Sequence, residues 1–369
     1  MTHRRAWSPR LLLVAVALFA AACAPQLRPM GPATTTPALG AGHLIAADGV
    51  KLPLRVWRPA GAPKSAILAV HGFNDHGGAF AQPAPFWAGR GIVTYAYDQR
   101  GFGDAVDRGY WPGMATLGAD LRAAIAAIRR RHPGLKLYVV GVSMGGAVAM
   151  SALARGGLPG VAGVVLVAPA VWGRAHMNPF ERGALWLAAK LVPWLGLTIE
   201  AIEIRPSDNI EMLRALANDP RVIHKTRVDT LAGLVDLMDA AFAAASVLAR
   251  DPLTRNGTGP LPLPATPRDY PMGGREGERA GAALTENAPA PLLMLYGLRD
   301  ELVPENPSFA VMRTLAARAR RALYKNGYHM LLRDLAAKTV WRDIAAWIED
   351  ASAPLPSGAD ARADRLLGP

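Results

Sequence analysis

The sequence predicts an α/β fold in which helices cover both faces of a mostly parallel central sheet. Continuous apolar runs recur along the chain, and helical segments separate them. Strands that are buried on both faces show such runs instead of alternating polar and apolar residues, which is typical of parallel sheets. With 369 residues, of which 51% are hydrophobic, the chain can bury a sizeable core and carry insertions.

Residues 1–22 have the features of a signal peptide. Arg4, Arg5 and Arg10 precede an apolar run, Leu11 to Ala22, that is too short to span a bilayer comfortably. This segment is therefore predicted to direct export and to be absent from the folded domain.

Cys23 is the only cysteine, so no intrachain disulfide can form. Its position after three alanines resembles a bacterial lipoprotein signal, although Ala20 stands where such signals usually have leucine. The resemblance implies lipidation of Cys23 and a membrane-anchored lipoprotein of the bacterial cell envelope. With Ala24 after the cysteine, the same resemblance implies no inner-membrane retention signal and favours the outer membrane, facing the periplasm. Ordinary cleavage that leaves a free cysteine is the alternative.

The formal net charge of +12 favours anionic partners. The arginines are scattered, and no basic run with interleaved aromatic residues occurs, so the sequence indicates no nucleic-acid partner. An anionic membrane surface fits the charge and the N-terminus better.

The first part of the predicted core spans residues 42–171 and follows a flexible tether that includes the lipidated cysteine (23–41). Asp48-Gly49 forms the turn of a hairpin over residues 43–58. Spacing of Leu117, Leu121, Ile125 and Ile128 predicts a helix over 114–131. Buried strands are predicted at 66–70, 92–97, 135–142 and 161–167.

After this sixth strand the pattern changes, and residues 172–250 are predicted to form an inserted helical cap without strands. Residues 183–197 are apolar on nearly all sides and carry one charge, Lys190. Such a helix is either buried on both faces or meets lipid on one of them. A second cap helix is predicted over 228–248.

A Pro/Gly-rich loop insertion over 251–289 leads into the second part of the core, 290–350. This part is predicted to contain strands at 291–297 and 321–324 and helices at 306–318 and 334–349. The tail, 351–369, is rich in Pro, Ala, Asp and Arg and is predicted to be disordered.

Gly141-Val142-Ser143-Met144-Gly145 lies between a β-branched strand and an Ala-rich helix. In that context Gly-x-Ser-x-Gly forms a sharp turn that presents a serine hydroxyl above a sheet. Ser143 is therefore the candidate nucleophile.

A serine nucleophile needs a base and an acid that orients the base. Asp300 and His329 each follow a predicted strand, in the chain order Ser, Asp, His that this kind of site requires. Glu301 and Asp334 are rival acids, but the first is adjacent to Asp300 and the second breaks the order. Both are assigned structural roles.

The backbone N–H groups of Phe73 and Met144 are the candidate oxyanion hole. Met144 opens the helix after Ser143, and Phe73 lies in the loop after the 66–70 strand. His71 is expected to be structural. Four other histidines have no assigned partner: His76, His132, His176 and His224.

These motifs, with Asp98-Gln99-Arg100-Gly101 and Tyr328-His329, resemble the monoacylglycerol lipase and lysophospholipase branch of the α/β-hydrolases. The resemblance covers roughly residues 43–250 and 290–350 and includes the cap. It implies an α/β-hydrolase fold and a serine esterase that cleaves a single-acyl-chain lipid ester by an acyl-enzyme route, with no metal or organic cofactor. The long loop 251–289 and the bulky Phe73 depart from the branch.

Two other functions remain open. A serine aminopeptidase of the same S33-like clan would need cap carboxylates to bind the substrate ammonium group, and the candidates are Glu181, Glu200, Glu203 and Glu211. A catalytically silent ligand-binding homologue would have no use for an aligned Ser143, Asp300 and His329.

Overall fold

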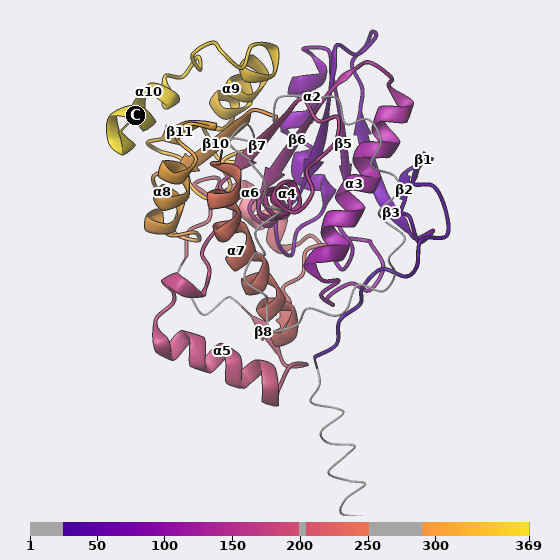
Figure 1. Cartoon of the computed structure of the whole chain (residues 1–369), viewed down its shortest axis with the longest axis vertical. Coiled ribbons are helices and arrows are strands. Elements are labelled where there is room, and N and C mark those ends of the chain that lie inside the picture. Colours follow the sequence, from indigo (N-terminus) through magenta and orange to yellow (C-terminus); the bar gives the residue numbers. More distant parts are fainter. Residues whose placement is uncertain (1–24, 199–203, 251–289, 369) are drawn as a thin grey trace, which may run out of the picture.

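The computed structural model describes residues 25–198, 204–250 and 290–368 (Figure 1). The predicted signal peptide, Cys23 and the 251–289 loop insertion lie outside the described residues.

A nine-stranded sheet runs through the molecule in the order β1-β2-β3-β5-β4-β6-β7-β10-β11. The first three strands and the contact of β3 with β5 are antiparallel, and every later pairing is parallel. The antiparallel strands are β1 (Ala38–Gly40), β2 (His43–Ile45) and β3 (Lys51–Trp57). The parallel strands are β4 (Ser65–Val70), β5 (Ile92–Tyr97), β6 (Lys136–Val142), β7 (Gly163–Val167), β10 (Leu292–Gly297) and β11 (Ala319–Tyr324). The predicted fold class is confirmed.

Helices cover both faces of this sheet, and each face has its own apolar core. One face packs against α3 (Met114–Arg131), α4 (Met144–Ala154), α7 (Val228–Leu248) and α8 (Glu305–Thr314). The other packs against α2 (Pro83–Ala88) and α9 (Ala337–Glu349). Strand β4 shows why its sequence is continuously apolar: Leu68 belongs to the first core and Ile67 to the second.

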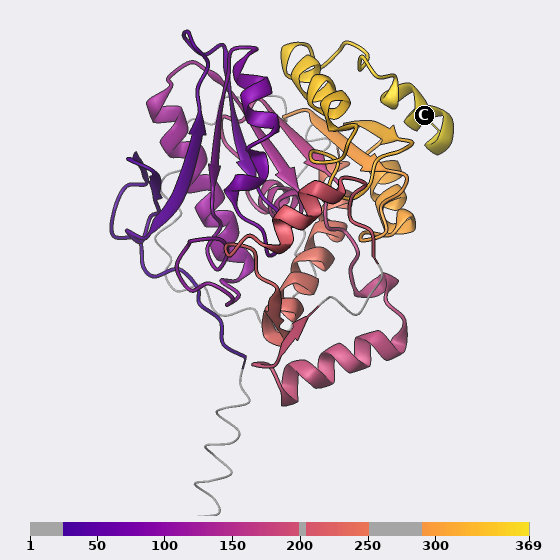
Figure 2. The same ribbon diagram turned by 180° about the vertical axis from the view of Figure 1, so that it is seen from behind.

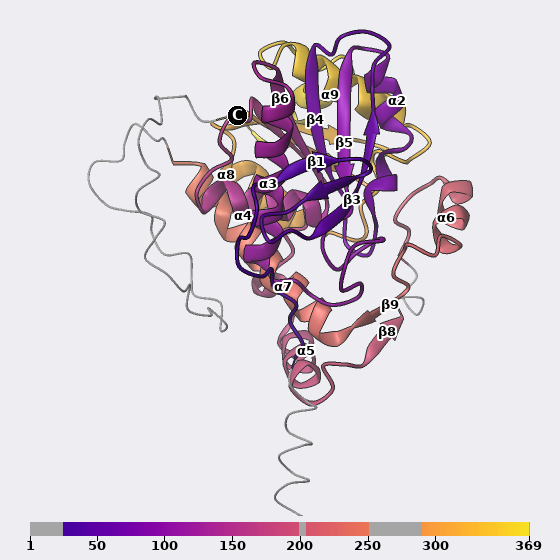
Figure 3. The ribbon, with the colours of Figure 1, turned by 90° about the vertical axis from the view of Figure 1, so that its right-hand side faces the viewer.

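The insertion between β7 and β10 contains more than helices. It holds η2 (Arg174–His176), α5 (Pro179–Leu191), α6 (Ile210–Ala217) and α7, together with an antiparallel pair of short strands, β8 (Gly196–Thr198) and β9 (Lys225–Arg227). Figure 3 shows α5, α6 and this strand pair lying away from the central sheet. The prediction of a cap without strands is wrong, and the 183–197 helix ends at Leu191 because Pro193 follows.

Two further details of the predicted cap change. The insertion follows the seventh strand, because β1 adds one strand that was not predicted. Helix α7 packs on α4 within the first core, so its C-terminal half belongs to the hydrolase core instead of the cap. In the described part of the chain, α7 is the one helix that is long and apolar enough to cross a membrane, and 56% of its apolar 18-residue stretch is buried within the protein.

The segment predicted as a flexible tether is packed against the domain from residue 25 onward. Leu27 forms a bridge with Trp111, the Met30 N–H donates to Thr116 Oγ1, and β1 pairs with β2. These partners are distant in sequence, so the Pro/Thr/Ala composition gave no sign of them.

The tail predicted to be disordered is also ordered. Residues 351–358 lead into α10 (Ala359–Leu367), which packs beside β11 at the edge of the sheet (Figure 1). Ala359, Ala363 and Leu367 repeat every four residues and are buried, while aspartates on the helix pair with arginines of β11.

Candidate active site

Ser143 occupies the sharp turn between β6 and α4. Its φ of +51° and ψ of −115° are strained values for a residue other than glycine. The turn is close-packed: a Cβ on Gly145 would lie 2.2 Å from the Val70 carbonyl oxygen, and one on Gly141 would lie 2.5 Å from that of Gly145. Side chains are therefore excluded at both glycines, and the strain places the Ser143 hydroxyl at the C-terminal edge of the sheet.

The structure brings Ser143, His329 and Asp300 into one hydrogen-bonded chain. The distance from His329 Nε2 to Ser143 Oγ is 3.0 Å, and that from His329 Nδ1 to Asp300 Oδ2 is 2.8 Å. The three residues follow β6, β11 and β10, which end at the same edge of the sheet.

Asp300 is fixed by its own loop. Its Oδ1 accepts the N–H groups of Leu302 (2.8 Å) and Val303 (2.9 Å), and its side chain is fully buried. The second oxygen is thereby directed at His329. A carboxylate at Nδ1 requires the proton on that nitrogen, so Nε2 presents its lone pair to the serine hydroxyl.

Neither rival acid contacts His329. Glu301 accepts the N–H of Arg205 from the insertion. Asp334 is buried and accepts the Tyr328 N–H and the Ser207 hydroxyl.

The loop after β4 also lies against Ser143. A Cβ on Gly72 would stand 3.5 Å from Ser143 Cβ, and Phe73 lines a cavity together with Ser143. Among the hydrogen bonds of the described residues, none uses the N–H of Phe73 or of Met144. Two free backbone donors beside a serine hydroxyl suit the stabilisation of a developing oxyanion.

His71 has the structural role that its loop position predicts. It is fully buried, its Nδ1–H donates to the Gly72 carbonyl (2.8 Å), and its Nε2 accepts the Gln99 N–H (2.9 Å). Burial lowers the pKa of His71 and keeps the ring neutral, so the ring holds the β4 loop in place beside Ser143.

The remaining histidines stand apart from the triad. His76 bonds Asp219 of the insertion (3.1 Å), and His132 bonds the Tyr95 hydroxyl (2.7 Å). His176 and His224 are exposed, the first with its ring edge on Phe242.

The cavity next to Ser143 has a volume of about 100 Å³ and is largely apolar. Phe73, Phe80 and Leu332 contribute to its walls. Sequence reasoning missed one polar feature of the lining, an ion pair between Asp75 and Arg333. The two residues are 258 positions apart, and no motif relates them.

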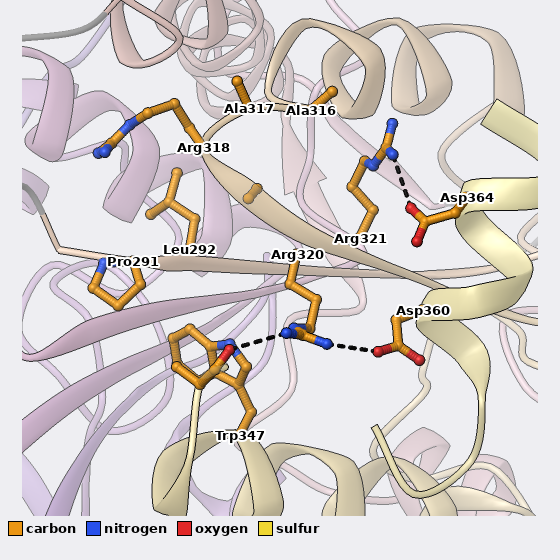
Figure 4. A pocket seen from close by; sticks show the side chains of 12 residues that line it. Pro291, Leu292, Ala316, Ala317, Arg318, Arg320, Arg321, Trp347, Asp360 and Asp364 are labelled. Carbon is orange, nitrogen blue, oxygen red and sulfur yellow. Dashed lines mark hydrogen bonds and ion pairs between the residues drawn. The ribbon is translucent and has the colours of Figure 1, made fainter. Parts of the chain in front are cut away.

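A larger cavity of about 400 Å³ lies at the opposite ends of the strands, where β10 and β11 begin (Figure 4). Arg320 pairs there with Asp360 (2.7 Å) and Arg321 with Asp364 (2.9 Å). This cavity holds no nucleophile and base of the kind found at Ser143, so it is not the candidate active site.

Within residues 25–198, 204–250 and 290–368, no cluster of three or more His, Cys, Asp or Glu side chains is placed to hold a metal ion.

Several relatives match this chain over most of its length, among them two lipases. A monoacylglycerol lipase of Mycolicibacterium smegmatis is 27% identical over 304 residues, covering 81% of this chain and 93% of its own. The monoglyceride lipase of Homo sapiens is 27% identical over 321 residues, covering 84% and 91%.

Solved structures share the fold. A monoglyceride lipase variant from Saccharomyces cerevisiae superposes with a TM-score of 0.63 at 16% identity, over 89% of this chain and all of that one. Paleococcus ferrophilus monoacylglycerol lipase gives 0.58 at 20% identity, over 82% and 99%.

The family model described as "Serine aminopeptidase, S33" (Hydrolase_4) matches residues 61–253, more than half of the chain. This range begins before β4 and ends beyond α7, so it contains the Ser143 turn and the described part of the insertion. The chain therefore belongs to the Hydrolase_4 family of α/β-hydrolases.

Proposed function

We propose that this protein is a serine hydrolase that cleaves carboxylic esters of single-acyl-chain lipids, monoacylglycerols or lysophospholipids, through an acyl-enzyme intermediate. The observation that carries the proposal is the hydrogen-bonded chain from Ser143 through His329 to Asp300. The names of the two relatives, a monoacylglycerol lipase and a monoglyceride lipase, support the substrate class.

In acylation, His329 Nε2 takes the proton of the Ser143 hydroxyl while Oγ attacks the ester carbonyl carbon. The carbonyl oxygen becomes an oxyanion beside the N–H groups of Phe73 and Met144. The protonated His329 then gives its proton to the alcohol oxygen, and the bond from that oxygen to the acyl carbon breaks. In deacylation, water gives a proton to His329 and attacks the acyl carbon, which releases the fatty acid and returns the proton to Ser143.

The small apolar cavity suits an acyl chain better than a charged amine. For the aminopeptidase alternative, Glu181 is already engaged, because its side chain accepts the Asn178 N–H in the capping box of α5. Asp75, inside the cavity lining, is paired with Arg333. Glu211 lies exposed on α6, and Glu200 and Glu203 fall outside the described residues.

A fluorophosphonate probe, which labels activated serines, tests the proposal together with a substrate panel. The full-length protein is expected to be labelled and to hydrolyse monoacylglycerols or lysophospholipids in preference to aminoacyl peptides. Ser143→Ala should abolish the label and lower kcat by several orders of magnitude. An unlabelled wild-type protein would favour the silent binding homologue, and peptide cleavage would favour the aminopeptidase.

We further propose that the enzyme is held at a membrane by lipidation of Cys23 and rests there on the outer face of α5. Phe180, Leu187 and Leu191 form an apolar stripe at spacings of seven and four residues, flanked by Trp186 and Trp194. Phe180 is 82% exposed and Trp186 64%. Aromatic and aliphatic side chains on an interfacial helix bind to the headgroup and acyl boundary.

The start of the described chain supports the same orientation. The Gln26 N–H donates to Asp229 at the start of α7 (3.0 Å), and the Asp229 N–H donates to the carbonyl of Pro193, just after α5 (3.0 Å). Cys23 precedes Gln26 by three residues, which span at most about 11 Å of extended chain. A lipid on Cys23 would therefore enter the bilayer close to the α5 face. The cell-envelope location, with the outer membrane preferred, remains part of this proposal.

A further inference from the structure

Residues 205–209 lie in the insertion, just before α6, and contact the two loops that carry His329 and Asp300. We infer that this segment holds His329 in register with Ser143, and that Ser207 and Asp334 are positioning residues for the reaction. The inference rests on the proposed serine-hydrolase function.

The backbone on both sides of His329 is fixed by this arrangement. The Met330 N–H donates to the carbonyl of Pro206 (2.9 Å), which belongs to the 205–209 segment. The Tyr328 N–H donates to Asp334 Oδ2 (2.8 Å). The N–H groups of the residues before and after the histidine therefore have one acceptor each, and the ring position depends on both.

Asp334 depends in turn on the segment. Its other oxygen accepts the Ser207 hydroxyl at 2.6 Å, and both residues are buried. Burial raises the pKa of Asp334, and the hydrogen bond from Ser207 opposes that effect. Without the hydroxyl, a buried carboxylate oxygen would lose its donor, so the carboxylate would move or take up a proton.

The same segment also reaches the acid loop. The Arg205 N–H donates to Glu301 Oε2 (2.8 Å), directly after Asp300. Asn209 Nδ2 donates to the carbonyl of Arg333 (2.9 Å), on the histidine side. One stretch of five residues thus ties together the loops of the base and of its orienting acid.

These contacts matter for rate because the triad tolerates little displacement. A shift of about 1 Å at a catalytic group costs roughly 10²-fold in rate. The cavity beside Ser143 is lined by Met330 and Arg333 but by neither Ser207 nor Asp334. The two residues are therefore expected to affect kcat through His329 without a direct effect on substrate binding.

The test measures kcat, KM and melting temperature of Ser207→Ala on a short soluble ester, in the full-length protein. We expect kcat to fall by about 10- to 100-fold with KM within about twofold, because bound substrate would still meet an intact cavity. Ser207→Thr, which keeps the hydroxyl, should recover most of the loss. Asp334→Ala should lower kcat as well, and adding Ser207→Ala to it should cause little further loss, since both changes remove the same hydrogen bond.

Ser151→Ala is the matched control, because Ser151 is buried on α4 and its hydroxyl has no protein partner in the described structure. Its kcat should equal that of the wild type. A Ser207→Ala protein that keeps full kcat, or one whose kcat is not recovered by Ser207→Thr, overturns the inference. If Asp334→Ala does not fold, the comparison of Ser207→Ala with Ser207→Thr decides alone. Failure of the proposed function would look different: Ser143→Ala would then retain activity.

Discussion

At the scale of single residues, the site depends on which ring nitrogen of His329 carries the proton. Asp300 offers one oxygen to two backbone N–H groups and the other to His329 Nδ1. Because a carboxylate only accepts, it forces His329 into the tautomer whose Nε2 can take the Ser143 proton. The orientation of one carboxylate thereby determines whether the serine can be activated.

Asp300→Asn is predicted to reduce kcat by about 10⁴-fold with the fold retained. The amide oxygen can still accept from Leu302 and Val303, but its NH₂ group would then face Nδ1 as a donor and favour the opposite tautomer. Steady-state kinetics on a soluble ester, with circular dichroism as the check on folding, measure the effect.

Glu301→Gln is the control, because Glu301 is the adjacent acid, is exposed and, among the residues that the structure describes, bonds only the Arg205 N–H. A small effect is expected. If Glu301→Gln or Asp334→Asn were the damaging change and Asp300→Asn were mild, Asp300 would not be the orienting acid.

The triad and its chain order could be predicted from sequence because each member follows a strand signal and Gly-x-Ser-x-Gly has a known turn geometry. The Asp75–Arg333 pair and the Ser207–Asp334 bond could not. Asp75 and Arg333 lie in two loops of the core that are 258 positions apart, and Ser207 meets Asp334 only when the insertion docks on the core. No local pattern encodes either contact.

At the scale of elements, the buried strands and helix α3 were predictable because their apolar patterns arise from the core itself. Helix α3 begins and ends at the predicted residues, with Leu117, Leu121 and Ile128 buried. Strand β1 was not predictable, since it has three residues and gains its order from pairing with β2.

Helix α10 differs from β1, because its sequence does contain a helical pattern. Ala359, Ala363 and Leu367 repeat every four residues and bury one face, and Asp360 and Asp364 repeat at the same interval toward the arginines of β11. The Pro-rich composition before the helix hid this short periodicity.

Asp360→Ala is predicted to lower the free energy of unfolding by about 1–3 kcal/mol. Its side chain is 9% exposed and accepts both Arg320 Nη1 (2.7 Å) and the Leu355 N–H (2.9 Å), so its removal leaves partly buried donors without an acceptor. Urea unfolding followed by circular dichroism measures the change.

Asp364→Ala provides the matched comparison on the same helix. The Asp364 side chain is 63% exposed, and its partner Arg321, which is buried, also donates to the Gly368 carbonyl (2.8 Å), so a smaller loss is expected than for Asp360→Ala. Equal losses for the two variants would mean that the burial of the Asp360 acceptor does not determine the size of the loss.

At the scale of the whole molecule, helix α5 and the start of the described chain lie at one end, and α9 and α10 lie at the other (Figures 1 and 2). Leu185, Ala188 and Ala189 hold the inner side of α5 against Val228 and Ala232. The outer stripe therefore contributes little to packing, and its exposure needs a reason outside the core.

Leu187→Glu with Leu191→Glu is predicted to reduce activity on bilayer-borne monoacylglycerol at least tenfold while activity on a short soluble ester stays within about twofold. Both leucines are at least half exposed, so the fold should tolerate the change, but two carboxylates in the headgroup region would oppose insertion and be repelled by anionic lipid.

Phosphatidylglycerol vesicles carrying monoacylglycerol serve as the substrate, and sedimentation with the same vesicles reports binding. Thr314→Glu with Ala317→Glu adds the same charge at exposed positions in and after α8, which lies away from α5 in both views, and should leave both activities unchanged. A parallel loss on both substrates, with a lower melting temperature, would instead mean that the α5 face stabilises the protein and does not dock on a membrane.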